Sequence, residues 1–195
     1  MKFENNYPDL RVRRTRKSLK DALIELLQEI EIEKITVNTL AKRANINRVT
    51  FYSHYKDIPD MLEKLAQDMI DQISKDLEDK TSYKDDSHNT NWQPMINLLE
   101  HISSQAVFYK VILGTRGVPL FKNRLIEFLI NRIVSQIGER REGSFITKTG
   151  VEEEVLAWYD SSAIIGTIIA WLNNDMPYTP RFLVAQFSII HNRTI

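Results

Sequence analysis

The sequence predicts an all-α protein, and three observations support this prediction. Apolar residues recur three and four positions apart over most of the chain, as they do along one face of a helix. The 195 residues include only 6 glycines and 6 prolines, and most of these lie between the periodic stretches. Strand-rich folds need turn residues at shorter intervals, so helices joined by a few loops are favoured.

The sequence of the N-terminal part of the chain predicts three helices. A leucine stripe between residues 19 and 27 marks the first one. Thr36 is suited to cap a second helix, and Asn45 tolerates the left-handed backbone geometry that a tight turn requires. Asn47 can cap a third helix, which we expect to run from Arg48 to about Tyr55.

A long amphipathic helix is predicted next, with Asp57 as its cap and Pro59 in its first turn. The domain boundaries follow from this order of elements. We expect an N-terminal helix-turn-helix domain over residues 9–57, a connecting helix over 58–80 and a C-terminal helical bundle over 81–195.

The C-terminal region also predicts helices. Apolar periodicity begins after Pro94, and a turn at Gly114–Pro119 precedes a further apolar stripe. Two long helices close the chain, roughly Glu152–Asn173 and Thr179–Asn192. The polar segments 81–91 and 138–150 lack apolar periodicity and are expected to be loops.

Composition narrows the class of protein. The chain contains no cysteine, so disulfides and thiolate metal sites are excluded and a reducing cytoplasm is the simplest location. The longest apolar stretch, Ser161–Leu172, is too short to span a bilayer, so we expect a soluble protein that has no membrane partner.

The formal net charge is zero, but the charge is unevenly distributed. Residues 1–57 hold 12 Lys and Arg against 8 Asp and Glu, and residues 11–20 hold six cations and no acid. A concentrated basic segment on a neutral body favours a local contact with a polyanion. The alternative interpretation is that these cations lie on the solvent-exposed start of a helix and contact no partner.

The third predicted helix has two faces. One points inward through Val49 or Phe51 together with Tyr55. The other points outward and offers donors, a cation and an aromatic ring, which suit base edges, thymine methyls and phosphates in a major groove. Its members are Arg48, Thr50, Tyr52, Ser53 and His54. Any small helical bundle also has polar outer faces, and this is the competing interpretation.

The segment from Ile35 to Leu62 resembles the N-terminal domain of the TetR (TetR/AcrR) family of bacterial transcriptional regulators. The residues that match the family pattern are Ala41, Ile46, Thr50, Tyr52, His54, Tyr55 and Leu62. Two positions depart from it: Asn45 replaces the usual Gly, and Ile58 replaces a common phosphate-contacting Lys. Lys56 could supply the missing charge.

The resemblance implies a role for each DNA-binding candidate. Arg48, Val49 and Tyr52 would contact base edges or methyl groups, while phosphate contacts would come from Thr36, Thr50, Ser53, His54 and Lys56. The basic segment, with Arg13, Arg14 and Lys17, would touch flanking phosphates. The partners implied are double-stranded operator DNA, a second copy of the chain and an unknown small-molecule effector.

The C-terminal region, through Ile165–Leu172 and Pro180, resembles a Gram-positive branch that includes relatives of the dihydroxyacetone-kinase regulator, so activation is an alternative to repression. The closing helices suit an intersubunit four-helix bundle, or else serve only as core. Their apolar candidates are Leu156, Tyr159, Ala163, Ile168, Trp171, Phe182, Leu183, Phe187 and Ile190. Candidate ligand-pocket residues, which could equally fill the core, are Trp92, Phe108, Tyr109, Phe121, Phe128 and Trp158.

An enzyme would need a convergent catalytic set, and the sequence offers none. It has four histidines, no cysteine and no nucleotide-binding glycine loop, so neither catalysis, a cofactor nor a metal site is predicted. A ligand-responsive repressor is the favoured function. The alternative is a co-activator or protein-interaction member of the same fold that binds DNA weakly or not at all by itself.

Overall fold

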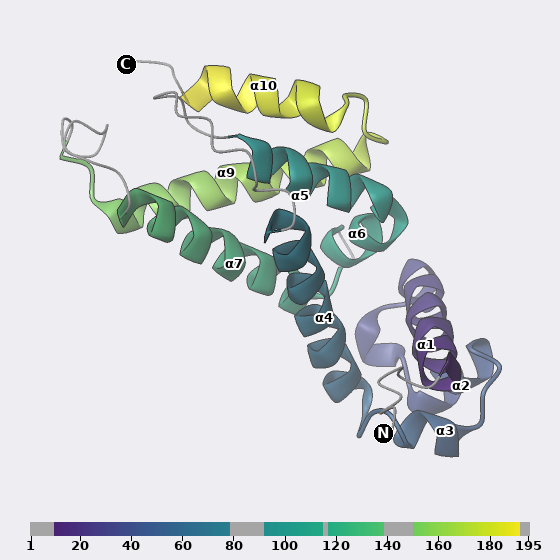
Figure 1. Cartoon of the computed structure of the whole chain (residues 1–195). Coiled ribbons are helices and arrows are strands. Elements are labelled where there is room, and N and C mark those ends of the chain that lie inside the picture. The colour runs from purple at the N-terminus through teal and green to yellow at the C-terminus, as the bar shows by residue number, and fades with distance from the viewer. Residues whose placement is uncertain (1–9, 79–91, 115–116, 139–149, 192–195) are drawn as a thin grey trace, which may run out of the picture.

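The computed structural model describes residues 10–78, 92–114, 117–138 and 150–191. Within these ranges the regular elements are helices, which confirms the predicted all-α class. Figure 1 shows two groups of helices joined by α4 (Ile58–Glu78), which leads from the N-terminal group into the C-terminal bundle. The expected loops at 81–91 and 139–149 lie outside the described residues, as does the start of the predicted C-terminal domain.

The N-terminal group consists of α1 (Leu10–Glu29), a short 3-10 turn η1 (Ile32–Lys34), α2 (Val37–Arg43) and α3 (Arg48–Tyr52). The predicted leucine stripe is buried in α1, where Leu19, Leu23 and Leu27 are at most 1 % exposed. Burying these side chains against α2 and the neighbouring helices supplies much of the driving force that holds the group together.

Helix α4 begins as the sequence predicts, with Asp57 at its N-terminus and Pro59 in its first turn. The Asp57 Oδ1 atom accepts a hydrogen bond of 2.8 Å from the Asp60 backbone N–H. The helix buries apolar side chains along its length, from Met61 near its start to Ile73 and Leu77 near its end. These side chains belong to one continuous hydrophobic core that includes both groups of helices.

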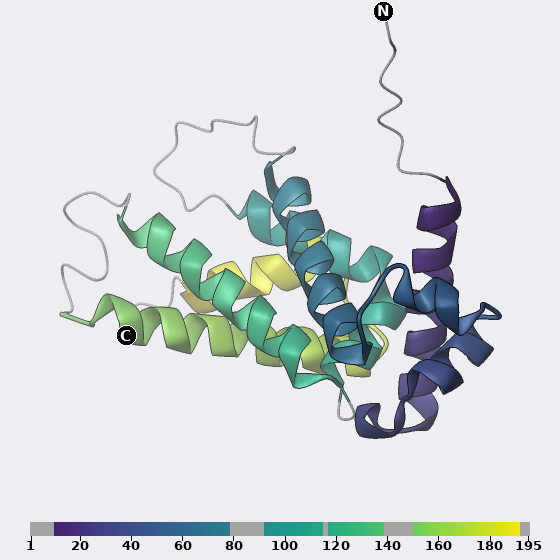
Figure 2. The same cartoon turned by 90° about the horizontal axis from the view of Figure 1, so that it is seen from below.

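The C-terminal bundle consists of α5 (Gln93–Ser104), α6 (Ala106–Leu113), α7 (Pro119–Gly138), α9 (Glu153–Asn173) and α10 (Pro180–His191). Helix α7 packs along α9, and α10 packs on α5. Figures 1 and 2 both show α9 and α10 running in opposite directions on the side of the bundle away from α3. Among the described elements, α6 lies against α1 and so connects the bundle directly with the N-terminal group.

Candidate nucleic-acid interface

The start of α2 is fixed by reciprocal hydrogen bonds between two threonines. The Thr39 backbone N–H donates to Thr36 Oγ1 at 3.1 Å, and the Thr36 backbone N–H donates to Thr39 Oγ1 at 3.0 Å. This capping box satisfies two backbone donors that a helix start otherwise leaves unpaired. Thr36 is the predicted cap, and it is also exposed at the surface.

The turn between α2 and α3 depends on Asn45. Its backbone has a φ of 53°, in the left-handed region that few residues other than Gly, Asn and Asp adopt easily. The next residue, Ile46, donates its backbone N–H to Ala41 O at 3.0 Å, which closes the turn. Asn47 then caps α3 by accepting the Val49 backbone N–H at 2.9 Å. The predicted turn and both caps are confirmed.

The inward face of α3 consists of Phe51 and Tyr55. They are 0 % and 3 % exposed, and their ring centres lie 5.6 Å apart. The sequence left Val49 and Phe51 as alternatives for this face, and the structure selects Phe51. Val49 is 74 % exposed instead.

Helix α3 ends at Tyr52, three residues earlier than expected. The backbone leaves the helix in a turn in which His54 N and Tyr55 N both donate to Phe51 O, at 2.9 and 3.0 Å. The Ser53 hydroxyl donates to Thr50 O at 2.7 Å and so competes for the local carbonyls. The outward residues therefore form a short helix followed by a turn.

The structure places the outward candidates on the surface. Tyr52 is 51 % exposed, and its ring meets Phe51 edge-on at 5.5 Å, which braces it against the buried layer. Thr50 and His54 are partly buried. The remaining DNA-binding candidates are exposed: Arg13, Arg14, Lys17, Thr36, Arg48, Val49, Ser53 and Lys56.

Electrostatics connect the basic segment of α1 with the end of α3. Burial lowers the pKa of the His54 imidazole, and the nearby positive charge of Arg16 lowers it further. Both effects favour the neutral form of the imidazole, which can both donate and accept a hydrogen bond. The same Arg16 charge also acts on Tyr55, so the end of the basic segment lies near the turn that follows α3.

The surroundings of Ile58 at the start of α4 explain why the chain has Ile there where the family commonly has Lys. Ile58 is 9 % exposed and belongs to the hydrophobic core, where a Lys would bury its charge. Lys56 is exposed, and its backbone N–H donates to Asp60 Oδ2 at 2.9 Å. Hydrogen bonds from Lys64 and from this backbone N–H lower the pKa of Asp60. The Lys56 side chain remains a candidate for the missing phosphate contact.

The six ligand-pocket candidates do not form one group. Phe108, Tyr109 and Phe121 are at most 8 % exposed and meet edge-on as a packed aromatic cluster. Trp92 and Phe128 are partly buried, whereas Trp158 is 51 % exposed on α9. Tyr109 and Phe121 are 0 % exposed and fill the core, as aromatic residues at helical spacing commonly do, whereas Phe108 also lines a pocket between α1 and the junction of α5 and α6.

A buried polar network in the bundle was not predicted. His101 is 7 % exposed, and its Nδ1 lies 2.5 Å from Asp76 Oδ2 of α4. Its Nε2 lies 2.8 Å from the Tyr109 hydroxyl and 3.3 Å from Gln105 Nε2. Asp76 and His101 are 25 residues apart in sequence, so no local pattern could pair them. Among the described residues no cluster of three or more His, Asp or Glu could hold a metal ion.

The interface candidates on the closing helices divide into two sets. Ile168, Trp171 and Leu183 are at most 7 % exposed and pack within the chain. The other six are partly or fully exposed: Leu156, Tyr159, Ala163, Phe182, Phe187 and Ile190. Sequence reasoning missed further exposed apolar residues on these helices and their connection: Val155, Trp158, Tyr178 and Ile189. They follow the same helical spacing, which could have identified most of them.

Helix α9 is, within the described ranges, the one helix long and apolar enough to cross a membrane by length and composition. Only 33 % of its apolar window is buried within the chain. A single helix of this kind is weak evidence for membrane insertion, and an apolar face left uncovered in one chain is also typical of a subunit interface.

This arrangement, an exposed helix after a tight turn attached to a helical bundle, is that of a helical transcriptional regulator. A family model described as a transcriptional regulator C-terminal region matches residues 90–193, which is more than half of the chain. The chain therefore belongs to the TetR family of transcriptional regulators.

Individual relatives agree with this assignment. The chain is 25 % identical over 163 residues to an uncharacterized HTH-type transcriptional regulator of Bacillus subtilis (strain 168), YxbF. That alignment covers 83 % of this chain but 40 % of the relative, so this chain spans well under half of the relative's length.

Two solved structures show the same fold. A TetR transcriptional regulator from Streptococcus agalactiae 2603V matches with a TM-score of 0.69 and 25 % identity, covering 93 % of this chain and 96 % of that one. The dihydroxyacetone kinase operon activator DhaS matches with a TM-score of 0.57 and 18 % identity, covering 90 % and 93 %. These relatives are named as regulators rather than as enzymes.

Proposed function

We propose that this protein is a ligand-responsive repressor that binds a pseudo-palindromic operator as a homodimer, with α3 in the major groove. The observation that carries the proposal is the exposed face of α3. Val49 and Tyr52 present apolar and aromatic surface to solvent at 74 % and 51 % exposure. Apolar groups left exposed beside a cation, here Arg48, suit thymine methyls and base edges.

The charge around α3 supports contact with a DNA backbone. Arg13, Arg14 and Lys17 are exposed on α1, and Arg16 of the same segment acts electrostatically on His54. Exposed cations on either side of a groove-reading helix would bind phosphates and fix the orientation of the helix. Thr36, Thr50, Ser53, His54 and Lys56 are proposed to make the remaining backbone contacts.

The closing helices support dimerisation. Tyr159 on α9 and Phe182 and Ile190 on α10 are 72 %, 48 % and 61 % exposed. Uncovered apolar side chains of this kind on the two closing helices suit a self-complementary interface. A dimer would place its two recognition helices on successive major-groove faces, ~34 Å apart. An effector that favours one spacing would then shift the protein between DNA-binding and non-binding states.

The test is retention of DNA from upstream of the gene by purified protein, measured by gel shift across a range of salt concentrations. We expect Tyr52→Ala and Arg48→Ala to abolish sequence-specific retention while the helical circular dichroism spectrum stays unchanged. Lys122→Ala is the matched control, because Lys122 is an exposed cation on α7 that takes no part in the proposed interface. Arg14→Ala should weaken binding to all sequences and reduce the salt slope by about 1.

Each outcome distinguishes the proposal from its rival. Unchanged retention by both α3 variants would refute the assignment of the recognition face. Absence of retention by the unmodified protein, restored only when a partner protein is added, would favour the co-activator or protein-interaction alternative.

A further inference from the structure

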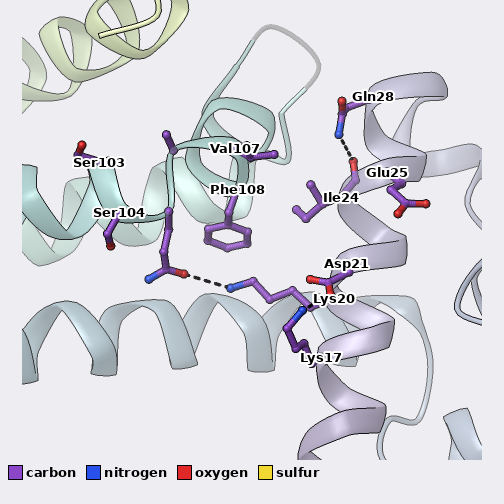
Figure 3. A pocket seen from close by; sticks show the side chains of 12 residues that line it. Lys17, Lys20, Asp21, Ile24, Glu25, Gln28, Ser103, Ser104, Val107 and Phe108 are labelled. Carbon is purple, nitrogen blue, oxygen red and sulfur yellow. Dashed lines mark hydrogen bonds and ion pairs between the residues drawn. The ribbon is translucent and has the colours of Figure 1, made fainter.

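A cleft lies between the N-terminal group and the C-terminal bundle. Its walls are α1 on one side and the junction of α5 and α6, residues 103–108, on the other (Figure 3). Its volume is about 630 Å³, which is within the range of ~300–1,000 Å³ typical of small-molecule sites. A molecule bound there would touch both groups of helices at once.

The Lys20 side chain extends from α1 across this cleft, as Figure 3 shows. Its Nζ lies 3.9 Å from the centre of the Phe108 ring and 3.4 Å from Gln105 Oε1. Burial lowers the pKa of this ammonium. The group is therefore partly stripped of water while its hydrogen-bond partner across the cleft is a neutral amide at the long end of the hydrogen-bond range.

The acids that line the cleft are hydrogen-bonded to other cations. Asp21 Oδ2 accepts a hydrogen bond of 2.5 Å from the Lys17 ammonium, and Glu25 Oε2 accepts one of 3.4 Å from the Arg43 guanidinium. Asp21 and Asp68 act on Lys20 through space, but in the described residues neither carboxylate forms a hydrogen bond with it. An anion entering the cleft would therefore find a partly desolvated ammonium that can exchange a weak partner for a charged one.

The cleft also has an apolar side. Val107 is 68 % exposed although it lies beside the buried Phe108, and Ile24 of α1 closes the opposite wall. Apolar surface next to a partly buried cation is the combination that recognises an amphiphilic anion. A neutral apolar molecule would leave the ammonium uncompensated, and a small inorganic anion would leave Val107 in water.

We propose that this cleft binds a small carboxylate with an apolar body, its carboxylate on Lys20 and its body against Ile24, Val107 and Phe108. Only the regulatory consequence of this site rests on the proposed function. A bound carboxylate would draw Lys20 away from Gln105, whose amide lies 3.3 Å from His101 in the core of the bundle. It would therefore change the contact between α1 and α6, and couplings of this kind alter DNA affinity by roughly 5- to 150-fold.

The experiment uses the full chain and 2-naphthoate as the probe, followed by backbone amide NMR shifts without DNA. We expect saturable shifts confined to α1 and the α5–α6 junction. Lys20→Met keeps the apolar stem and removes the charge, and we expect it to weaken binding at least tenfold. Lys122→Met removes an exposed lysine elsewhere and should leave the affinity unchanged. The neutral isostere 2-naphthylmethanol should bind at least tenfold more weakly than the carboxylate.

A second variant guards against a folding defect. Val107→Asp alters an exposed side chain, so it should keep the fold, and its negative charge should repel the probe and abolish saturable binding. Equal affinity of Lys20→Met and the unmodified protein, equal binding of the neutral isostere, or shifts centred on α9 and α10 would each overturn the site.

Gel shifts with and without 2-naphthoate separate the site from the proposed function. A change in DNA retention that is lost in Lys20→Met would support the regulatory consequence. Unchanged retention despite saturated binding would overturn that consequence and leave the binding site established. Failure of the protein to retain any DNA would contradict the proposed function and not the cleft.

Discussion

The guanidinium of Arg43 forms two hydrogen bonds with the carboxylate of Glu29, at 2.8 and 2.6 Å. The pair joins the last turn of α2 to the end of α1, and a bidentate geometry fixes both side chains. The hydrogen bond from Arg43 lowers the pKa of Glu29 below its usual value of 4.5.

This pair predicts a pH-dependent contribution to stability. Because the folded-state pKa of Glu29 is lowered, the contribution is complete above pH 4.5 and is lost as the pH falls through the folded value. Glu29→Gln should lower the urea midpoint at pH 7 and should have a smaller effect at pH 3. Glu33→Gln, an exposed glutamate in the turn after α1, is the control. An equal effect of Glu29→Gln at both pH values would contradict the prediction.

The left-handed turn predicts opposite effects for two substitutions of Asn45. Asn45→Ala places a side chain with no compensating hydrogen bond at a φ of 53° and should cost about 1 kcal/mol of unfolding free energy. Asn45→Gly removes the steric conflict and should be neutral or stabilising. Urea denaturation of the two variants measures the difference. If Asn45→Ala is as stable as Asn45→Gly, the turn geometry is wrong.

The buried position of the Tyr109 hydroxyl predicts that its removal lowers the stability of the protein even when the packing of the ring is kept. Burial raises the pKa of this phenol, so the group is protonated and bonds to His101 Nε2 at 2.8 Å. Tyr109→Phe leaves the ring in place but deprives buried His101 of a partner, which should cost about 1–3 kcal/mol. Tyr178→Phe, at a tyrosine that is 53 % exposed, should change the unfolding free energy by less than about 0.5 kcal/mol. Equal effects of the two variants would disprove the network.

The exposed apolar face of α9 predicts that a charge introduced there changes the oligomeric state. Tyr159 is 72 % exposed, so Tyr159→Arg should leave the single chain folded while placing a charge in the proposed interface. Light scattering after size exclusion should show a dimer for the unmodified protein and a monomer for the variant. Asn123→Arg, an exposed position on α7, should remain dimeric. A monomeric unmodified protein would remove the basis for a two-site operator.

Local structure could be predicted from sequence because its causes lie within a few residues. Thr36, Asn45 and Asn47 act on backbone groups at most four positions away, and the structure confirms each of them. The end of α3 was set about three residues too late, because the competing hydrogen bonds around Ser53 leave no apolar signal.

Packing partners could not be predicted in the same way. Ile168 and Tyr159 share helix α9 and were expected on one interface, yet one is 0 % and the other 72 % exposed. Apolar residues at helical spacing indicate that one face of a helix is covered. They do not indicate whether the covering side chains belong to the same chain or to a second copy. Similarly, nothing near His101 in the sequence indicates that Asp76 and Tyr109 surround it. The residues of the DNA-contact face remain predictions until they are tested.

The continuity of α4 has a consequence for anyone who wishes to dissect this molecule. A fragment that stopped at residue 57 would lose Met61 and Leu65, which are buried in the core that also contains Leu23 and Phe51. The chain is therefore not modular at that boundary. A chimaera that joins this N-terminal group to another sensor domain should therefore include the whole of Ile58–Glu78. Without that helix, the apolar surface that it covers would be exposed to solvent.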